Sequence, residues 1–174
     1  EDTQYDNSPR QYYAYSVKEA IDGGFYIGGY SNNSSGSDIT KILIKTDSSG
    51  NEVWMNTYGP GQIHSIDLTS DGGCIATGST YFGYSQPGNF FILKTNSNGE
   101  SEWDDTIIDY SHFDKGSEII QITDNQYTIV GYTESFSQYG DDDIWLLSYN
   151  IIEGCTDENA CNFDSNATDD DGSC

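Results

Sequence analysis

The sequence predicts an all-β protein made of repeated four-stranded antiparallel sheets, each formed by about 50 residues. The segment Lys45–Trp54, KTDSSGNEVW, returns 49 positions later as KTNSNGESEW, and the Asp22–Gly24 turn returns at the same spacing. We find no amphipathic helical pattern in the chain. A period of this size indicates that each unit is a small sheet, which must stack on its neighbours because it cannot bury its faces alone.

The strands follow one order within each unit. A first strand precedes the Asp-Gly or Asp-Asn turn, and a second, rich in aromatic and β-branched residues, follows it. The third strand is apolar on both faces, which predicts a central strand covered on both sides. A fourth strand carries Trp54 or Trp103. The first three strands are expected at Tyr13–Glu19, Gly24–Tyr30 and Ile39–Lys45, at Ile63–Thr69, Cys74–Thr80 and Asn89–Lys94, and at Gly116–Thr123, Tyr127–Thr133 and Asp143–Tyr149.

The chain divides into an extended N-terminal segment, a repeat region and a C-terminal module. The third unit stops at Asn150 without a fourth strand. The N-terminal segment therefore either completes a sheet, in its own molecule or in a neighbouring one, or follows further repeats of a longer protein. Because Glu1 is not Met, we expect a processed protein or a piece of a longer one. The expected parts are residues 1–10, residues 11–150 with units at about 11–59, 60–109 and 110–150, and residues 151–174.

The charge of the chain is strongly one-sided. Its 6 basic and 29 acidic residues give a formal net charge of −23. Such a surface repels phosphates, so we expect no nucleic-acid partner. No apolar run approaches the roughly 18–20 residues that span a bilayer, so we expect no membrane insertion.

The run Asp47-x-x-Gly50-x-x-x-Trp54 resembles the tryptophan-docking motif of quinoprotein-type propellers, in which the Trp packs between blades. More broadly, residues 11–150 resemble the blades of secreted surface propellers of bacteria and archaea. The resemblance implies a β-propeller-like fold, incomplete or completed by a neighbour. We expect structural roles for Trp54 and Trp103, and for Trp145 in the third unit. Two full units and a truncated third are fewer than the usual four to eight blades of a closed ring.

The C-terminal module begins Gly154-Cys155-Thr156-Asp157 and ends Asp170-Asp171-Gly172-Ser173-Cys174. It resembles a short repeat found near the C-termini of surface proteins of marine Bacteroidota. That resemblance implies secretion and a place on the cell surface or in an extracellular matrix, and it implies no catalytic activity.

Cysteine clustering indicates disulfide chemistry outside a reducing cytosol, since three of the four Cys lie in the last 20 residues. Cys155 and Cys174 frame the module and are the preferred pair. Cys161 is then free or bonded to another chain. Cys74 lies in an expected strand and is predicted to be a buried thiol.

The module is too small to have a core, so a disulfide or a metal must fix it. Its oxygen ligands are of the kind that Ca²⁺ prefers. Two interpretations stay open, a calcium site and a solvated acidic tail held by a disulfide. The candidate ligands are Asp157, Asn159, Asp164, Asn166, Asp169, Asp170 and Asp171.

Other motifs are sparse. His64 and His112 lie in no catalytic or metal-binding pattern, and no nucleophile or phosphate-binding motif occurs, so we expect no enzyme. Asn-x-Ser/Thr and Asp-Thr-apolar patterns mark candidate glycosylation sites at Asn32, Asn33, Asn166 and Thr106.

The sequence therefore predicts a secreted, non-enzymatic structural or adhesive protein that associates with itself by strand exchange or with other copies. The alternative is a glycan-binding, lectin-like propeller that uses exposed loop aromatics. Those aromatics are Tyr12, Tyr13, Tyr81, Tyr84 and Tyr139.

Overall fold

The structure is a computed structural model that describes residues 10–33, 36, 38–80, 88–107, 112–134 and 141–174. The described residues form strands and turns and contain no helix. Residues 1–9, where strand exchange was predicted, lie outside the described part of the chain, as do Tyr81, Tyr84 and Tyr139. The all-β prediction is confirmed.

The described residues of the repeat region form three antiparallel sheets. Each sheet is a meander of consecutive strands, as expected when short turns join the strands. Sheet I contains β1 (Gln11–Glu19), β2 (Phe25–Asn32), β3 (Thr40–Thr46) and β4 (Glu52–Pro60). Sheet II contains β5 (Gln62–Leu68), β6 (Cys74–Ser79), β7 (Phe90–Thr95) and β8 (Ser101–Ile107). Sheet III contains β9 (Asp114–Thr123), β10 (Gln126–Thr133) and β11 (Asp143–Asn150).

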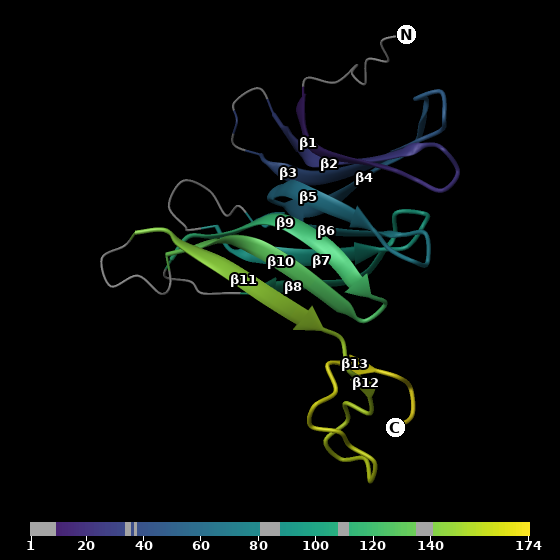
Figure 1. Cartoon of the computed structure of the whole chain (residues 1–174), viewed down its shortest axis with the longest axis vertical. Coiled ribbons are helices and arrows are strands. Elements are labelled where there is room, and N and C mark those ends of the chain that lie inside the picture. The colour runs from purple at the N-terminus through teal and green to yellow at the C-terminus, as the bar shows by residue number, and fades with distance from the viewer. Residues whose placement is uncertain (1–9, 34–35, 37, 81–87, 108–111, 135–140) are drawn as a thin grey trace.

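The sheets stack face to face in chain order, with sheet II in the middle (Figure 1). Strand β5 lies against β1 and β2, and β9 lies against β5 and β6. We call the face of a sheet that looks toward the next sheet in the sequence its forward face, and the opposite face its rear face. No closed ring is formed by the described strands.

Two apolar cores fill the spaces between the sheets. The first core joins the forward face of sheet I to the rear face of sheet II through Tyr26, Leu43, Ile63, Ile66, Cys74, Ala76, Phe91 and Leu93. The second core joins the forward face of sheet II to the rear face of sheet III through Ile75, Phe90, Ile92, Ile119, Tyr127 and Ile129. Sheet II is thus covered on both faces, which explains why every residue of β6 and β7 is buried.

The repeated Lys and Asp of the sequence form one repeated ion pair. Lys45 Nζ lies 2.8 Å from the Asp22 carboxylate, and Lys94 Nζ lies 2.6 Å from Asp71. Both ammonium groups also donate to the carbonyl of the following residue, and both lysines are buried. Each pair ties the first turn of a sheet to the end of its third strand. The Lys45 ammonium holds the pKa of Asp22 below its ordinary value.

The third sheet differs from the prediction in one respect. The apolar run of its third strand was expected to be covered on both sides, and for β11 this is wrong. Ile144 is 89% exposed and Leu146 is 70% exposed, because no described strand lies in front of sheet III. Among the described strands, β11 also forms the edge of its sheet, where sheets I and II each continue with a fourth strand.

The C-terminal module follows β11 directly. It contains two short parallel strands, β12 (Glu153–Gly154) and β13 (Asp169–Asp170). The Ile151 N–H donates to the Asn125 carbonyl, which attaches the module to the β9–β10 turn. In Figure 1 the module lies below sheet III, at the opposite end of the molecule from the N-terminus.

Candidate functional site

Trp54 docks sheet I on a turn of sheet II. Its ring meets Tyr26 edge-on at a centroid distance of 5.8 Å and lies over Gly99, in the turn between β7 and β8. Asn56 and Tyr58 extend the contact by donating hydrogen bonds of 3.0 and 2.7 Å to the Gly99 carbonyl. Gly99 has a φ of 75°, and a Cβ there would lie 2.7 Å from Trp54 Cη2. Trp54 is partly buried and joins the two sheets, as a docking residue would.

Trp103 and Trp145 play corresponding parts at the next interface. Trp103 packs on Tyr127 and stacks on Tyr149 at 5.8 Å, and Trp145 meets Phe90 edge-on at 5.3 Å. Both indoles are partly buried against the second core.

A repeated β-bulge places residues from all three sheets around one polar cavity. Each first strand carries one extra residue at the same point of its pairing with the second strand. The extra residues are Tyr15, His64 and Ser117, and all three line a cavity of about 280 Å³ together with Gln62 and Lys115. Bulges redirect side chains and are common beside binding sites. Here they bring three residues together that lie far apart in the sequence.

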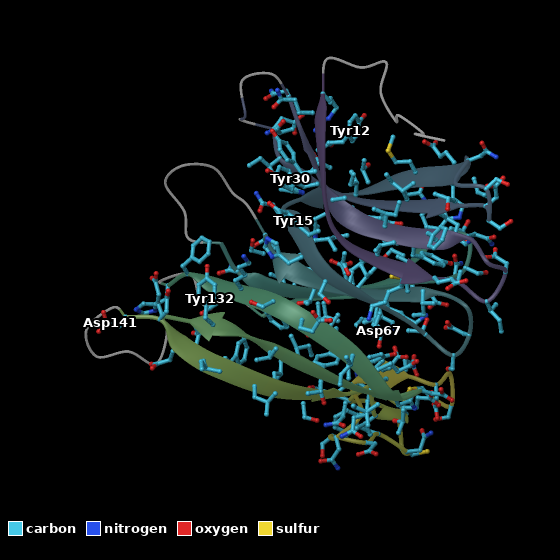
Figure 2. All side chains as sticks on the ribbon, turned by 45° about the horizontal axis from the view of Figure 1, so that its top comes forward. Tyr12, Tyr15, Tyr30, Asp67, Tyr132 and Asp141 are labelled. Carbon is cyan, nitrogen blue, oxygen red and sulfur yellow. A yellow bond between two sulfur atoms is a disulfide. The ribbon has the colours of Figure 1, made fainter. Side chains whose placement is uncertain are left out.

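Tyrosines extend this cavity on sheet I. Tyr30 stacks between Tyr13, at 4.7 Å, and Tyr15, at 5.8 Å, and Tyr15 in turn contacts the His64 ring at 5.3 Å. Figure 2 shows Tyr15 and Tyr30 at the same end of the sheets as Tyr132, whose ring lies 6.0 Å from the Lys115 ammonium. Tyr13 and Tyr15 remain exposed. The cavity therefore offers aromatic faces beside one cation.

The charge state of the cavity follows from burial. Burial, together with the nearby Lys115, lowers the pKa of His64 to about 4, so the imidazole is neutral at pH 7. His64 Nδ1 is buried without a hydrogen-bond partner, while Nε2 lies 3.3 Å from Gln62 Oε1. Burial and the neighbouring Tyr15 also raise the pKa of Tyr30 to about 12. Lys115 thus supplies the positive charge of this site.

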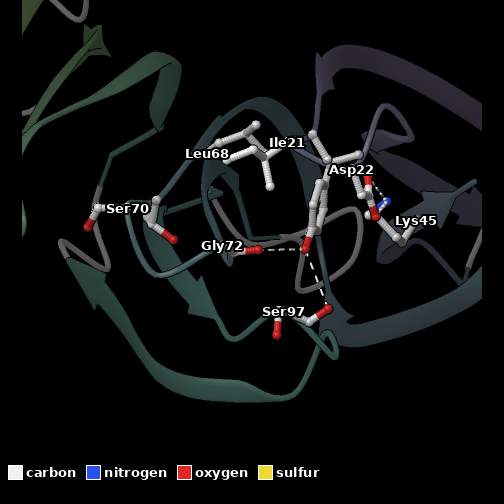
Figure 3. A pocket seen from close by; sticks show the side chains of 10 residues that line it. Ile21, Asp22, Lys45, Leu68, Ser70, Gly72 and Ser97 are labelled. Atoms are coloured by element: carbon white, nitrogen blue, oxygen red, sulfur yellow. Dashed lines mark hydrogen bonds and ion pairs between the residues drawn. The ribbon is translucent and has the colours of Figure 1, made fainter. Parts of the chain in front are cut away.

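A second cavity, of about 390 Å³, lies between sheets I and II at the level of their first turns. Tyr26 lines it, and its hydroxyl donates to the Gly72 carbonyl at 2.9 Å, with the Ser97 carbonyl 3.4 Å away (Figure 3). Ile21 and Leu68 form its apolar wall, and Lys45 with Asp22 closes one side. Burial raises the pKa of Tyr26 to about 12, so its hydroxyl stays protonated and serves as a hydrogen-bond donor between the sheets. We interpret this cavity as part of the packing interface between sheets I and II.

The module contains the expected disulfide, Cys155–Cys174. Cys161 is exposed and has no disulfide, and Cys74 is buried, as expected for a core thiol. Burial raises the pKa of the Cys74 thiol, so it stays protonated. A bond from Cys161 to another chain stays a prediction.

The acidic residues of the module are mostly engaged in local turns. Asp157, Asp164, Asp170 and Asp171 each accept a backbone N–H from two residues further on. Asn159 and Asn166 donate side-chain bonds of 3.1 Å to Asp157 and Asp164, while Asp169 lies in β13. Within the described residues, no three acidic, His or Cys side chains are grouped as a metal site would require. Calcium binding stays a prediction.

The candidate glycosylation sites differ in accessibility. Asn166 is exposed in the module, whereas Thr106 is partly buried in β8, where it pairs with Phe91. Asn32 ends β2, and its buried Oδ1 has no hydrogen-bond partner, while Asn33 follows the strand and is partly buried. Glycosylation at these four positions stays a prediction.

Sequence reasoning missed the bulge residues Tyr15, His64 and Ser117. Their signal was present, since Tyr15 and His64 are 49 positions apart, as the repeat requires. The residue types differ at this position, so similarity of sequence could not point to it. Only the strand register does.

Comparisons with protein-family models and with curated proteins found no match to this chain. In the part of the chain that the structure describes, no helix is both long and apolar enough to cross a membrane.

Proposed function

We propose that this chain is a non-enzymatic, extracellular structural or adhesive protein and a subunit of a cell-surface assembly or fibre, with propeller-like blades as its building units. The observation that carries the proposal is the unpaired edge of sheet III. Strand β11 has eight residues and alternates apolar side chains on its two faces, and no described strand pairs with its outer edge. A long apolar edge presents free N–H and C=O groups and invites another strand to add to it.

Several further observations support an extracellular assembly. The Cys155–Cys174 disulfide persists in oxidising surroundings. The formal net charge of −23 opposes nonspecific clumping. Calcium held by the acidic turns of the module belongs to this proposal, and so does a bond between Cys161 and a neighbouring chain.

Strand addition by residues 1–9 of a neighbouring copy is tested by deleting them. The parent chain is expected to form assemblies, and the deleted chain is expected to remain monomeric by sedimentation velocity. A deleted chain that assembles as the parent does would refute strand donation. A matched control deletes the same number of residues from the C-terminus and carries Cys155→Ser, so that both chains lose a terminal segment of equal length.

A second candidate function, glycan binding, is favoured by the cavity of Tyr15, His64 and Ser117. Tyrosine faces stack on the apolar faces of sugar rings, and Lys115 can pair with the carboxylate of an acidic sugar. A glycan array of neutral and acidic sugars tests this candidate, with Tyr15→Ala as the variant and Val53→Ala, an exposed residue of β4 outside the cavity, as the control. If Tyr15→Ala binds the same glycans as the parent chain, the glycan does not bind in this cavity.

A further inference from the structure

The two interfaces inside the chain follow one rule, in which the forward face of a sheet packs on the rear face of the next sheet. The strand register identifies the equivalent positions. Leu43, Ile92 and Leu146 lie on the forward faces of the three sheets. They occupy equivalent positions in the third strands, as their pairing with the second strands shows. Leu43 and Ile92 are 0% exposed, because the next sheet covers them, whereas Leu146 is 70% exposed.

The rear faces show the same relation at the other end of the stack. Val17, Ile66 and Ile119 occupy equivalent positions in the first strands of the three sheets. Ile66 and Ile119 are 0% exposed under the preceding sheet, whereas Val17 is 60% exposed. Around Val17 the face is apolar, with Phe25 and Ile27 partly buried on β2. Ile42 and Ile44 on β3 are already buried, so the uncovered part of this face lies on β1 and β2.

A backbone hydrogen bond is repeated at each interface. The Ile66 N–H donates to Ser16 Oγ, and the Ile119 N–H donates to Ser65 Oγ, each at 3.3 Å. Glu118 takes the place of these serines in sheet III, where it pairs with Val130. Its side chain is exposed, and a carboxylate is a stronger acceptor for an N–H than a hydroxyl. The forward face of sheet III therefore carries an acceptor where the Val17 N–H of a further sheet I would lie.

From this equivalence we infer that the forward face of sheet III binds the rear face of sheet I of a second copy of the chain. The contact continues the series of interfaces already formed within the chain, with Leu146 and Ile144 on one side and Val17 on the other. Because the two surfaces differ, the contact is heterologous and leads to rings or open filaments. This inference rests on the proposed function of the chain as an assembly subunit, and it specifies the two surfaces through which copies associate.

The size of the faces sets the expected strength. Strands of about eight residues extend roughly 26 Å, and the three described strands of sheet III span about 14 Å, so the two faces together bury on the order of 700 Å². That area lies below the range of stable complexes, so the contact is expected to be weak, and the formal charge of −23 on each copy opposes association further. Association is therefore expected to depend on concentration and to strengthen in about 1 M salt, where the Debye length is about 3 Å.

The test uses sedimentation velocity of the full chain and of two variants, Leu146→Lys on the forward face and Val17→Lys on the rear face. Both residues are exposed, so neither substitution disturbs the fold of the monomer. Ile21→Lys is the control, since Ile21 is 103% exposed in a turn outside both faces. We expect the parent and Ile21→Lys to form a concentration-dependent series of oligomers and each face variant to lose at least tenfold in association constant.

Mixing the two face variants gives the decisive result. One intact forward face and one intact rear face remain in the mixture, so it is expected to form 1:1 dimers that grow no further. A parent that stays monomeric, face variants that assemble like the parent, or a mixture without dimers would each overturn the inference. If assembly instead requires residues 1–9 and ignores both face variants, strand donation stands while the face contact fails.

Discussion

The contact between Trp54 and Gly99 gives the sharpest stability prediction. Gly99→Ala places a methyl group 2.7 Å from Trp54 Cη2 and 2.6 Å from Asn56 Nδ2, at a residue whose φ is 75°. A left-handed φ costs an ordinary residue about 1–2 kcal/mol. Overpacking against a rigid ring adds about 1–3 kcal/mol. The free energy of unfolding should therefore fall by about 2–5 kcal/mol, a large share of the roughly 5–15 kcal/mol of a typical domain.

A matched glycine separates the two contributions. Gly72 has a φ of 82°, and a Cβ there would meet nothing within 4 Å. Gly72→Ala should therefore cost only the backbone part, about 1–2 kcal/mol. The measurement is urea unfolding followed by far-UV circular dichroism, in which the midpoint reports the change as long as the slope is constant.

A double-mutant cycle tests the contact itself. Trp54→Ala alone should lower the free energy of unfolding by about 3–5 kcal/mol, because it leaves a cavity where the indole ring packs between sheets I and II. In that background, Gly99→Ala should cost clearly less than in the parent chain, since the ring has gone and only the contact with Asn56 Nδ2 and the backbone cost remain. Equal costs of Gly99→Ala and Gly72→Ala in the parent chain would refute the docking of Trp54 on this turn.

Two further predictions concern His64 and the module. The pKa of His64 is about 4 in the folded chain and 6.5 ordinarily, so only the unfolded chain binds this proton between those pH values. The stability that depends on a neutral His64 is therefore complete above pH 6.5 and is lost as the pH falls toward 4. The free energy of unfolding of His64→Gln should lack this dependence on pH. For the module, Ca²⁺ is expected to slow hydrogen exchange in residues 155–174 and to leave sheets I–III unchanged, because a disulfide and local turns order it separately from the two cores. Exchange that saturating Ca²⁺ does not alter would count against calcium binding.

Much of the fold could be predicted from the sequence because its signals are local. The Asp-Gly turns, the alternating strands and the repeated Lys and Asp depend on short segments, and the expected strand positions agree with the observed ones to within a few residues. The Cys155–Cys174 disulfide was also predictable, because its two residues frame a segment too short to hold a core. For the cavity of Tyr15, His64 and Ser117 the sequence offered only spacing, since the three residue types have nothing in common.

Tertiary structure decided which apolar residues are covered. Leu43, Ile92 and Leu146 look alike in sequence, each an aliphatic residue in the third strand of its unit. Leu43 and Ile92 are fully buried and Leu146 is exposed, because burial depends on whether another sheet follows in the stack. The sequence by itself determined the strands, the turns and the disulfide, which are set by neighbouring residues. The stacking of whole sheets alone decided the two cores, the shared cavity and the two end faces, because those depend on residues about 50 positions apart.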